Sequence, residues 1–279
     1  YAAFGTVIVY ILDYVVSVRN GISLSAADML YMLKTLLIEI CFLPLTGLMS
    51  LDLLTYRNAP MWYLSAMLFA LPVLMWVGLR LYKIFKYILV WAIPLGIQIL
   101  FLLKYGGILP WQDYIGFINT GIMRGLSGMM LGGAIYFVSC RVVSGCFVHP
   151  LSRESATLFT VAEAVLLGLF MAAVIMGVHG MGEMVALYVM VIALVLIYSK
   201  ITFFSGINIK AAGILGSLSM PIFCIHWGIY RWVGAFLGYL DYRIAIILTF
   251  ILCLITAIIL KAVFTKLSSL SKRHNPDPS

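Results

Sequence analysis

Charged residues are scarce in this chain. Of its 279 residues, 10% are charged and 64% are hydrophobic. A soluble domain has about 25% charged and about 45–50% apolar residues. The shortage of charge excludes an ordinary soluble globular domain, and the chain is predicted to be an integral membrane protein.

Several signals of other protein classes are also missing. The five cysteines form no Cys-x-x-Cys pair, so neither a disulfide framework nor a zinc site is predicted, and no metal is expected. The 18 basic residues spread over many connectors, which argues against nucleic-acid binding. No charged segment with a cleavage site precedes the first apolar run, so that run is not predicted to be a signal peptide.

What the chain does contain is a series of apolar runs long enough to cross a bilayer. A hydrocarbon core about 30 Å thick requires ~20 apolar residues per helix. We predict an all-α, polytopic transmembrane helical bundle that forms one membrane domain over residues 1–266. Residues 267–279 are expected to be a polar, disordered cytoplasmic tail. About nine helices are expected, over residues 1–18, 29–49, 60–80, 85–104, 114–140, 156–178, 183–203, 212–238 and 242–265.

The distribution of lysine and arginine predicts the orientation, because cytoplasmic connectors carry the excess of basic residues. If the nine segments cross in alternation, twelve basic residues fall on one side and three, Arg57, Lys104 and Arg243, on the other. The C-terminus lies on the basic side and is predicted to be cytoplasmic. Tyr1 then lies on the opposite side, as expected if at least one leading helix is missing from the chain.

Seven polar side chains fall inside the predicted spans, where such groups are costly and often functional. Their six charges sum to zero, which fits either internal ion pairs or a polar cavity. Asp13 and Lys34 are close enough to the membrane edge to reach it. Glu39 and Glu163 fit either structural ion pairs or functional groups. The seven are Asp13, Lys34, Glu39, Arg124, Glu163, His226 and Arg231.

Two of these side chains differ from the rest in their surroundings. Arg124 is predicted to lie about ten residues into a glycine-bearing helix, too deep to reach the membrane edge. In "SLSMPIFCIHWGIYRW", helical spacing places His226 on one face with Ser219, Phe223 and Tyr230. His226 fits either a lined cavity or an ordinary buried histidine held by one hydrogen bond.

A further polar spot is the glycine-rich stretch "GVHGMGEM". His179 and Glu183 are four residues apart there and could pair. A solvated loop is the more ordinary interpretation.

Three stretches, taken together, resemble the acyltransferase 3 family. The pattern from Ser219 to His226, just before the final helix, is similar to that family's "SYxIYLxH" signature. "NAPMWYLSAMLF", residues 58–69, is similar to its "PLWFLxALL" segment. "MRGLSGMMLGGAIYF", residues 123–137, is similar to its Arg- and Gly-bearing helix. The order and spacing of the three agree, and the resemblance covers most of the chain.

The resemblance implies an enzyme that passes an acyl group, usually acetyl, from cytoplasmic acyl-CoA to a sugar hydroxyl of a surface glycan. It implies acetyl-CoA as the donor, a glycan acceptor and membrane lipid as partners, and a bacterial plasma membrane as the location. A homo-oligomer is possible, and the resemblance does not decide the oligomeric state. The family's first helix carries an Arg and a His, and the first run here carries neither. A missing leading helix would explain this departure.

Acyl transfer to a hydroxyl requires a base, stabilisation of the thioester carbonyl oxygen and positive charge for the CoA phosphates. On this hypothesis the catalytic residues are His226 and Arg124. The acceptor would contact Trp62, Tyr63, Ser219, Tyr230, Arg231 and Glu163. The CoA phosphates would contact Arg80, Lys83 and Lys86. The two aromatic residues equally fit an interfacial belt, and the three basic residues equally fit positive-inside topology.

A transporter or flippase for a lipid-linked sugar is the alternative, since balanced intramembrane charge also suits a substrate pathway. The lack of a repeat between the two halves of the chain argues against it. A third interpretation is an inactive relative or an assembly subunit. Dependence on CoA would separate the enzyme from the transporter.

Overall fold

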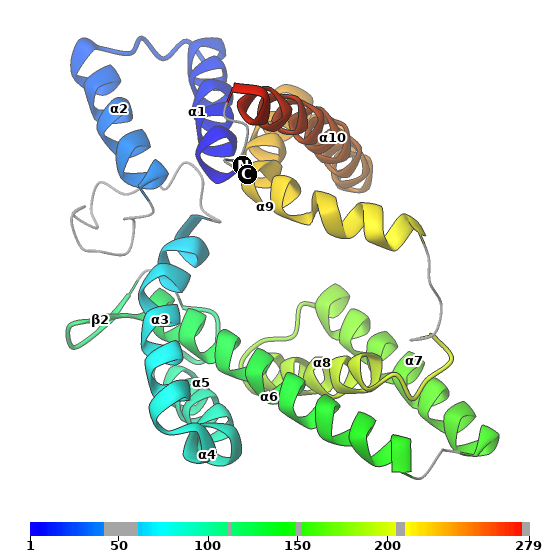
Figure 1. Ribbon diagram of the computed structural model, residues 1–279. Helices are drawn as coiled ribbons and strands as arrows, with labels where there is room; N and C mark the ends of the chain where they lie inside the picture. Colours follow the sequence, from blue (N-terminus) through cyan, green and yellow to red (C-terminus); the bar gives the residue numbers. More distant parts are fainter. Residues whose placement is uncertain (42–60, 111–112, 149–151, 205–209, 275–279) are drawn as a thin grey trace. The chain divides into compact units, whose positions relative to one another are not determined.

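A computed structural model describes residues 1–41, 61–110, 113–148, 152–204 and 210–274 (Figure 1). The described residues are almost entirely helical, as predicted. The described part is an all-α, multi-pass membrane protein, because seven of its helical stretches are long and apolar enough to cross a bilayer. The seven are Ala2–Arg19, Trp62–Arg80, Tyr82–Tyr105, Thr120–Gly145, Arg153–Met176, Met181–Ser199 and Arg243–Lys266.

The described residues group into two compact units. The first unit joins the two ends of the chain, Tyr1–Ser65 and Lys210–Ser279. The second unit is the continuous stretch Ala66–Ile209. Each unit has its own packing.

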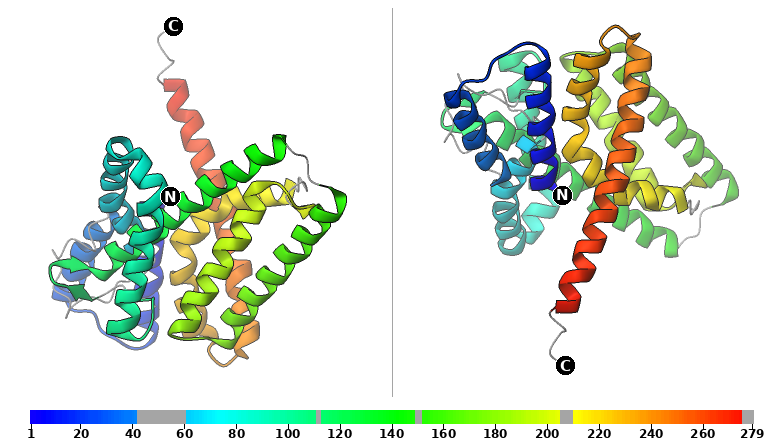
Figure 2. Two further views of the ribbon diagram at one scale, coloured as in Figure 1. Left: turned by 90° about the horizontal axis from the view of Figure 1, so that it is seen from below. Right: turned by 90° about the horizontal axis from the view of Figure 1, so that it is seen from above.

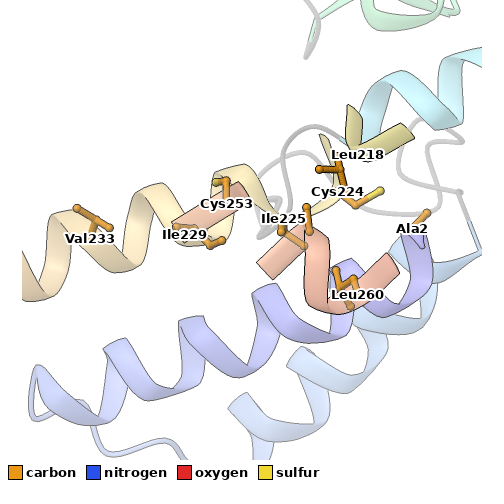
Figure 3. Close-up of a cluster of buried hydrophobic side chains, with 9 residues drawn as sticks. Ala2, Leu218, Cys224, Ile225, Ile229, Val233, Cys253 and Leu260 are labelled. Atoms are coloured by element: carbon orange, nitrogen blue, oxygen red, sulfur yellow. The ribbon is translucent and has the colours of Figure 1, made fainter. Parts of the chain in front are cut away.

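The first unit is built on a long helix, α9 (Lys210–Leu237). α1 (Ala2–Arg19) and α10 (Tyr242–His274) both pack against α9, as the right-hand view of Figure 2 shows. Ile225, Ile229 and Val233 recur every four residues on α9, so they lie on one face and meet the neighbouring helices. The buried cluster that results is drawn in Figure 3. Its members are Ala2, Leu218, Cys224, Ile225, Ile229, Val233, Cys253, Ala257 and Leu260.

α1 and α9 run parallel to each other and approach closely. A methyl group added at Gly5 would lie 2.6 Å from the Cβ of Cys224, and one added at Gly228 would lie 2.7 Å from Val9. Small residues of this kind let two helices in a membrane pack closely. The touching pairs advance along both helices together: Gly5–Cys224, Val9–Gly228, Asp13–Arg231 and Arg19–Ala235.

The parallel packing corrects the predicted alternation of nine crossings. That alternation places the first run and residues 212–238 in opposite directions. Two parallel crossings require an odd number of crossings between them, and five of the seven apolar stretches lie between α1 and α9. α9, at 28 residues, exceeds the ~20 residues that a crossing requires. If these five described stretches are the crossings between α1 and α9, Arg19 joins the minority side, and the basic residues divide eleven against four.

The helix left out of that count is α2 (Ala26–Ile40), which has 15 residues in its described part. It begins at a capping box, in which the Ser25 hydroxyl accepts a hydrogen bond from the Asp28 backbone N–H at 3.2 Å. The Asp28 carboxylate accepts from the Ser25 backbone N–H at 2.9 Å and from its hydroxyl at 2.6 Å. These hydrogen bonds hold the pKa of the Asp28 carboxyl below its ordinary value. Residues 42–49 of the predicted span 29–49 lie outside the described residues.

The second unit holds most of α3 (Met61–Arg80), then α4 (Tyr82–Ile84), a π-helical turn η3 (Phe85–Leu89) and α5 (Val90–Tyr105). α6 (Thr120–Val148), α7 (Arg153–Met176) and α8 (Met181–Ser199) follow. α6 packs against both α5 and α8, and α7 packs against α8. Leu131 and Ile135 of α6 form a small buried cluster with Val191 of α8.

A short β-hairpin stands where the sequence predicted the start of a helix. β1 (Tyr114–Ile115) pairs antiparallel with β2 (Ile118–Asn119), and the turn between them includes Gly116 at φ +63°. The predicted helix 114–140 therefore begins six residues late, at Thr120. At the other end of the chain, α10 continues to His274. The polar tail expected from residue 267 is thus helical over 267–274, and residues 275–279 lie outside the described part.

Candidate functional site

The predicted site residues divide between the two units. The first unit contains Trp62, Tyr63, Ser219, His226, Tyr230 and Arg231. The second unit contains Arg80, Lys83, Lys86, Arg124 and Glu163.

His226 lies near the middle of α9 and is half-buried. Its Nδ1 is 2.9 Å from the carbonyl oxygen of Phe223 and 3.2 Å from that of Ile222. A carbonyl oxygen can only accept, so Nδ1 must carry the proton and donate it. In the neutral imidazole, Nε2 is then the nitrogen with the lone pair. The helix backbone therefore fixes His226 in the tautomer that can act as a base at Nε2.

A row of aromatic rings leads to this imidazole. The rings of Trp62 and Tyr63 meet edge to face, with centroids 5.6 Å apart. Tyr63 is 6.4 Å from the ring of Phe223, and Phe223 is 6.0 Å from the imidazole of His226. The start of α3 thus meets α9 within the first unit. Tyr63 therefore lies next to Phe223, on the face of α9 that was predicted to contain His226, and Trp62 lies next to Tyr63.

The remaining residues on that face of α9 are less involved. Ser219 is exposed, and its hydroxyl donates to the carbonyl of Gly216 at 2.7 Å. This bond lies in the turn before Pro221, and a serine inside a helix commonly donates to a carbonyl of the preceding turn. Tyr230 is exposed and lies 6.0 Å from the ring of Trp227. Among the described contacts, neither Ser219 nor Tyr230 touches a ring of the aromatic row.

Arg231 forms an ion pair across the α1–α9 interface. Its Nη2 is 2.8 Å from Oδ1 of Asp13, whose side chain is 7% exposed while that of Arg231 is 40% exposed. Charges removed from water need such a partner, because an isolated buried charge is costly. Two of the six predicted intramembrane charges therefore balance each other. The pair also shows that Asp13 is buried at a helix interface and does not extend to the membrane edge.

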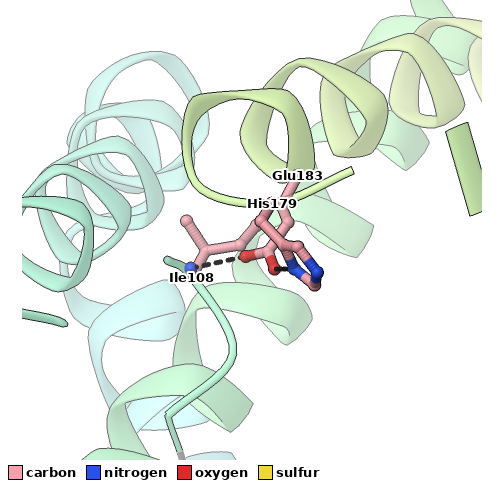
Figure 4. Close-up of polar contacts among 3 residues, drawn as sticks. All are labelled: Ile108, His179 and Glu183. Carbon is pink, nitrogen blue, oxygen red and sulfur yellow. Dashed lines mark hydrogen bonds and ion pairs between the residues drawn. The ribbon is translucent and has the colours of Figure 1, made fainter. Parts of the chain in front are cut away.

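Arg124 and Glu183 hold one loop of the second unit from two sides. Arg124 donates from Nη1 to the carbonyl oxygen of Leu109 at 2.9 Å. The Glu183 carboxylate accepts from the backbone N–H of Ile108 at 2.9 Å and lies 3.5 Å from Nδ1 of His179, as Figure 4 shows. Arg124 and Glu183 also attract each other electrostatically. We call these contacts the loop clamp; it fastens the loop after α5 to the starts of α6 and α8.

The loop clamp changes the interpretation of Arg124. Because α6 begins at Thr120, Arg124 is its fifth residue, not a residue about ten positions into the helix. The predicted depth of about ten residues is therefore wrong, and the guanidinium contacts the loop before the helix. Glu183 lies in the first turn of α8, where a carboxylate is also favoured by the helix dipole. His179 is 90% exposed, so its pairing with Glu183 is loose.

Glu163 is a buried carboxyl in the middle of α7. It is 3% exposed, and among the described residues its Oε2 has no hydrogen-bond partner. Such a group inside a membrane span is costly when charged, which makes it a candidate for binding a proton or another cation. The sequence identified Glu163 correctly as an intramembrane carboxyl, and no described contact gives it a structural partner.

The three predicted phosphate-binding cations lie close together along the chain in the second unit. Arg80 ends α3, and Lys83 lies in α4; both are exposed. The Lys86 ammonium lies 5.4 to 5.9 Å from the ring centroids of Tyr82, Tyr87 and Phe137. Cation–π contacts of this kind hold an ammonium in place. Lys86 is therefore positioned, whereas Arg80 and Lys83 have the exposure expected of basic residues at a membrane edge.

Sequence reasoning missed two partners. Asp13 was identified as an intramembrane charge, but nothing in the sequence indicated Arg231 as its partner. Glu183 was paired only with His179, whereas its main bond is to the backbone of Ile108. Among the described residues, no cluster of three or more His, Cys, Asp and Glu side chains could hold a metal ion.

Comparisons with protein-family models, with curated proteins and with solved structures found no match to this chain. A functional proposal for this chain therefore rests on its motifs and on the geometry within each unit.

Proposed function

We propose that this protein is a membrane acyltransferase that moves an acyl group, in the first instance acetyl, from acyl-CoA to a sugar hydroxyl. The resemblance of three stretches to the acyltransferase 3 family supplies the reaction class. The observation that carries the proposal is the state of His226, whose Nδ1 is committed to two backbone carbonyls. That arrangement leaves Nε2 as the basic nitrogen, half-buried at the end of a row of aromatic rings.

The proposed step is the attack of an acceptor hydroxyl on the thioester carbonyl. The hydroxyl oxygen forms a bond to the carbonyl carbon while Nε2 of His226 takes the hydroxyl proton. The C–S bond then breaks, and the proton passes from the imidazole to the departing thiolate of CoA. A histidine is suited to both transfers because its ordinary pKa lies near neutral pH.

The aromatic row supports the assignment of the acceptor. A sugar presents one face of C–H groups and a rim of hydroxyls, so flat rings can pack on the face and leave a hydroxyl directed to a base. Tyr63 and Phe223 form this row with the imidazole at its end. Trp62 extends it. Arg231 and Ser219 are engaged elsewhere, in an ion pair and in a backbone bond.

The donor side of the proposal rests on the second unit. Lys86, held among three aromatic rings, with Lys83 and Arg80 is proposed to meet the phosphates of CoA. The loop clamp accounts for Arg124 structurally, so its catalytic role stays a prediction.

A second candidate function is transport of a lipid-linked sugar, and Glu163 favours it. A buried intramembrane carboxyl whose Oε2 has no partner among the described residues suits a proton or cation pathway. The two functions differ in their need for CoA. Only the acyltransferase consumes acyl-CoA and leaves an ester on the glycan.

The test uses membranes from cells that express the full chain, compared with membranes from cells carrying the empty vector. Both are supplied with radiolabelled acetyl-CoA, and the glycan fraction is treated with mild alkali, which cleaves O-acetyl esters. The proposal predicts base-labile label that depends on the protein. Lipid-linked sugar that crosses the membrane without CoA, with no label in the glycan, would instead support the transporter.

The acceptor side is tested by Tyr63→Ala with Tyr239→Ala as the matched control, because Tyr239 is 80% exposed in the turn before α10. Because one aromatic contact contributes ~0.5–1.5 kcal/mol, Tyr63→Ala should raise the acceptor KM roughly 2- to 12-fold. The Tyr239 variant should match the wild type. An equal change of the acceptor KM in both variants would mean that the aromatic row does not contact the acceptor.

A further inference from the structure

A groove in the first unit lies between the first half of α9 and residues 258–266 of α10. It has a volume of about 620 Å³. Ile214 and Leu218 line it from α9, and Ile258 and Ala262 line it from α10. Ile214 and Ile258 are exposed, so the groove opens outward from the helix pair. Its lining is therefore suited to a hydrocarbon chain.

The polar part of the groove lies along one edge of α10. Lys261, Thr265 and Lys266 complete the lining, and the apolar span of α10 ends at Lys266. Ile258, Lys261, Ala262 and Thr265 follow the spacing i, i+3, i+4 and i+7, so apolar and basic residues share one helical face. The two ammonium groups are thus placed where the hydrocarbon of a bilayer gives way to its headgroups.

Lys261 is held across the groove and does not extend freely. Its Nζ donates to the Ser217 hydroxyl at 2.5 Å, and that hydroxyl in turn donates to the carbonyl of Ile214 at 2.6 Å. An ammonium has three donors, so one bond to Ser217 fixes its position and leaves it able to donate to an anion. A lysine held in this way differs from a basic residue that simply marks the edge of a span.

We propose that this groove binds one anionic phospholipid, with an acyl chain along Ile214 and Ile258 and the phosphate at Lys261 and Lys266. The charge complementarity is direct: two cations at the end of an apolar groove match one phosphate at the end of a hydrocarbon chain. Basic pockets between membrane helices recognise anionic headgroups in this way. A zwitterionic lipid carries the same chains but less net charge, so the groove should prefer the anionic lipid.

The experiment is native mass spectrometry of the purified full chain with phosphatidylglycerol and, separately, with phosphatidylcholine of identical acyl chains. The wild type should retain one phosphatidylglycerol more tightly than phosphatidylcholine. In the double variant Lys261→Gln/Lys266→Gln, affinity for phosphatidylglycerol should fall roughly 30-fold, since each lysine contributes about a factor of five. Affinity for phosphatidylcholine should change little.

Two further variants keep the test informative. Ala262→Trp fills the groove without changing its charge, and it should lower the affinity for both lipids. Arg243→Gln removes one cation from the opposite end of the same helix and should bind as the wild type does. Equal elution volume and helical circular dichroism across the variants establish that each is folded.

Three results would overturn the proposal. One is equal binding of phosphatidylglycerol by all variants. Another is an equal loss in Arg243→Gln. The third is displacement of the bound lipid by acyl-CoA at lower concentration than by phosphatidylglycerol, which would make the groove a donor site. The readout is lipid binding alone, so its outcome is independent of the acyltransferase proposal.

Discussion

Arg231 in the first unit and Arg124 in the second are both arginines within apolar stretches, yet the structure uses them differently. Arg231 lies past the middle of α9 and pairs with a carboxylate, Asp13, on a neighbouring helix. Arg124 lies one turn into α6 and donates to a loop carbonyl, at Leu109. The neighbouring elements decide the partner. Arg231 meets a carboxylate on the helix packed against α9, whereas Arg124 reaches back to the loop before its own helix.

The difference teaches that a charge in an apolar run is not by itself evidence of a functional site. The Asp13–Arg231 pair is accounted for by the packing of α1 on α9, and Arg124 is accounted for by the loop clamp. His226 differs from both arginines, because its contacts engage only Nδ1 and leave Nε2 as the basic nitrogen. Three substitutions test the comparison, in order of expected effect.

The largest effect is expected from Asp13→Ala, which leaves Arg231 without its carboxylate. Breaking a buried pair costs ~3–5 kcal/mol, and because Arg231 is 40% exposed we expect roughly 2–3 kcal/mol. The free energy of unfolding, measured by denaturant titration in mixed micelles, gives the value. The double variant Asp13→Ala/Arg231→Ala should cost less than the sum of the two single variants. Strict additivity would mean that the two residues are not coupled.

An intermediate effect is expected from Gly228→Ala, because the new methyl group would lie 2.7 Å from Val9 on α1. Such overpacking costs ~1–3 kcal/mol, and flexible adjustment of Val9 places the expected loss at about 1–2 kcal/mol. Gly234→Ala is the matched control on the same helix, since nothing lies within 4 Å of its added methyl. The control should be neutral or slightly more stable. Equal stability of the two variants would contradict the close packing of α1 and α9.

The smallest effect is expected from Arg124→Ala, at about 1 kcal/mol, because the lost bond joins a partly exposed side chain to a backbone carbonyl. Hydrogen exchange should become faster at residues 106–109 and stay unchanged in α9. Arg124→Lys should restore part of the protection, since an ammonium can still donate to Leu109. If Arg124→Ala destabilised the protein more than Asp13→Ala, the contrast between the two arginines would be lost.

Much of the fold could be predicted because apolar runs of sufficient length determine where helices cross a membrane. α3, α7 and α8 begin and end within three or four residues of their predicted bounds, because glycines, prolines and charges mark their ends. The predicted start of α6 was wrong because "YIGFIN", residues 114–119, is mostly apolar and aromatic. Such a short run fits a strand as well as a helix by hydrophobicity alone.

Relations between distant residues could not be predicted. Nothing local indicates that Asp13 meets Arg231 or that Tyr63 lies beside Phe223, because these contacts depend on which helices become neighbours. The parallel direction of α1 and α9 has the same origin, and it changed the predicted topology. The face shared by Phe223 and His226 was predictable, since helical spacing alone sets it.

The measurement that tests the central claim most directly is acetyl transfer by His226→Gln compared with His179→Gln. Both variants remove an imidazole and keep a side chain of similar size, but only the first removes the basic Nε2 at the end of the aromatic row. With equal amounts of folded protein in the membrane, transfer from radiolabelled acetyl-CoA should fall roughly 100-fold or more in His226→Gln. It should stay at the wild-type level in His179→Gln. Wild-type transfer in both variants, or an equal loss in both, would contradict the assignment of His226 as the base.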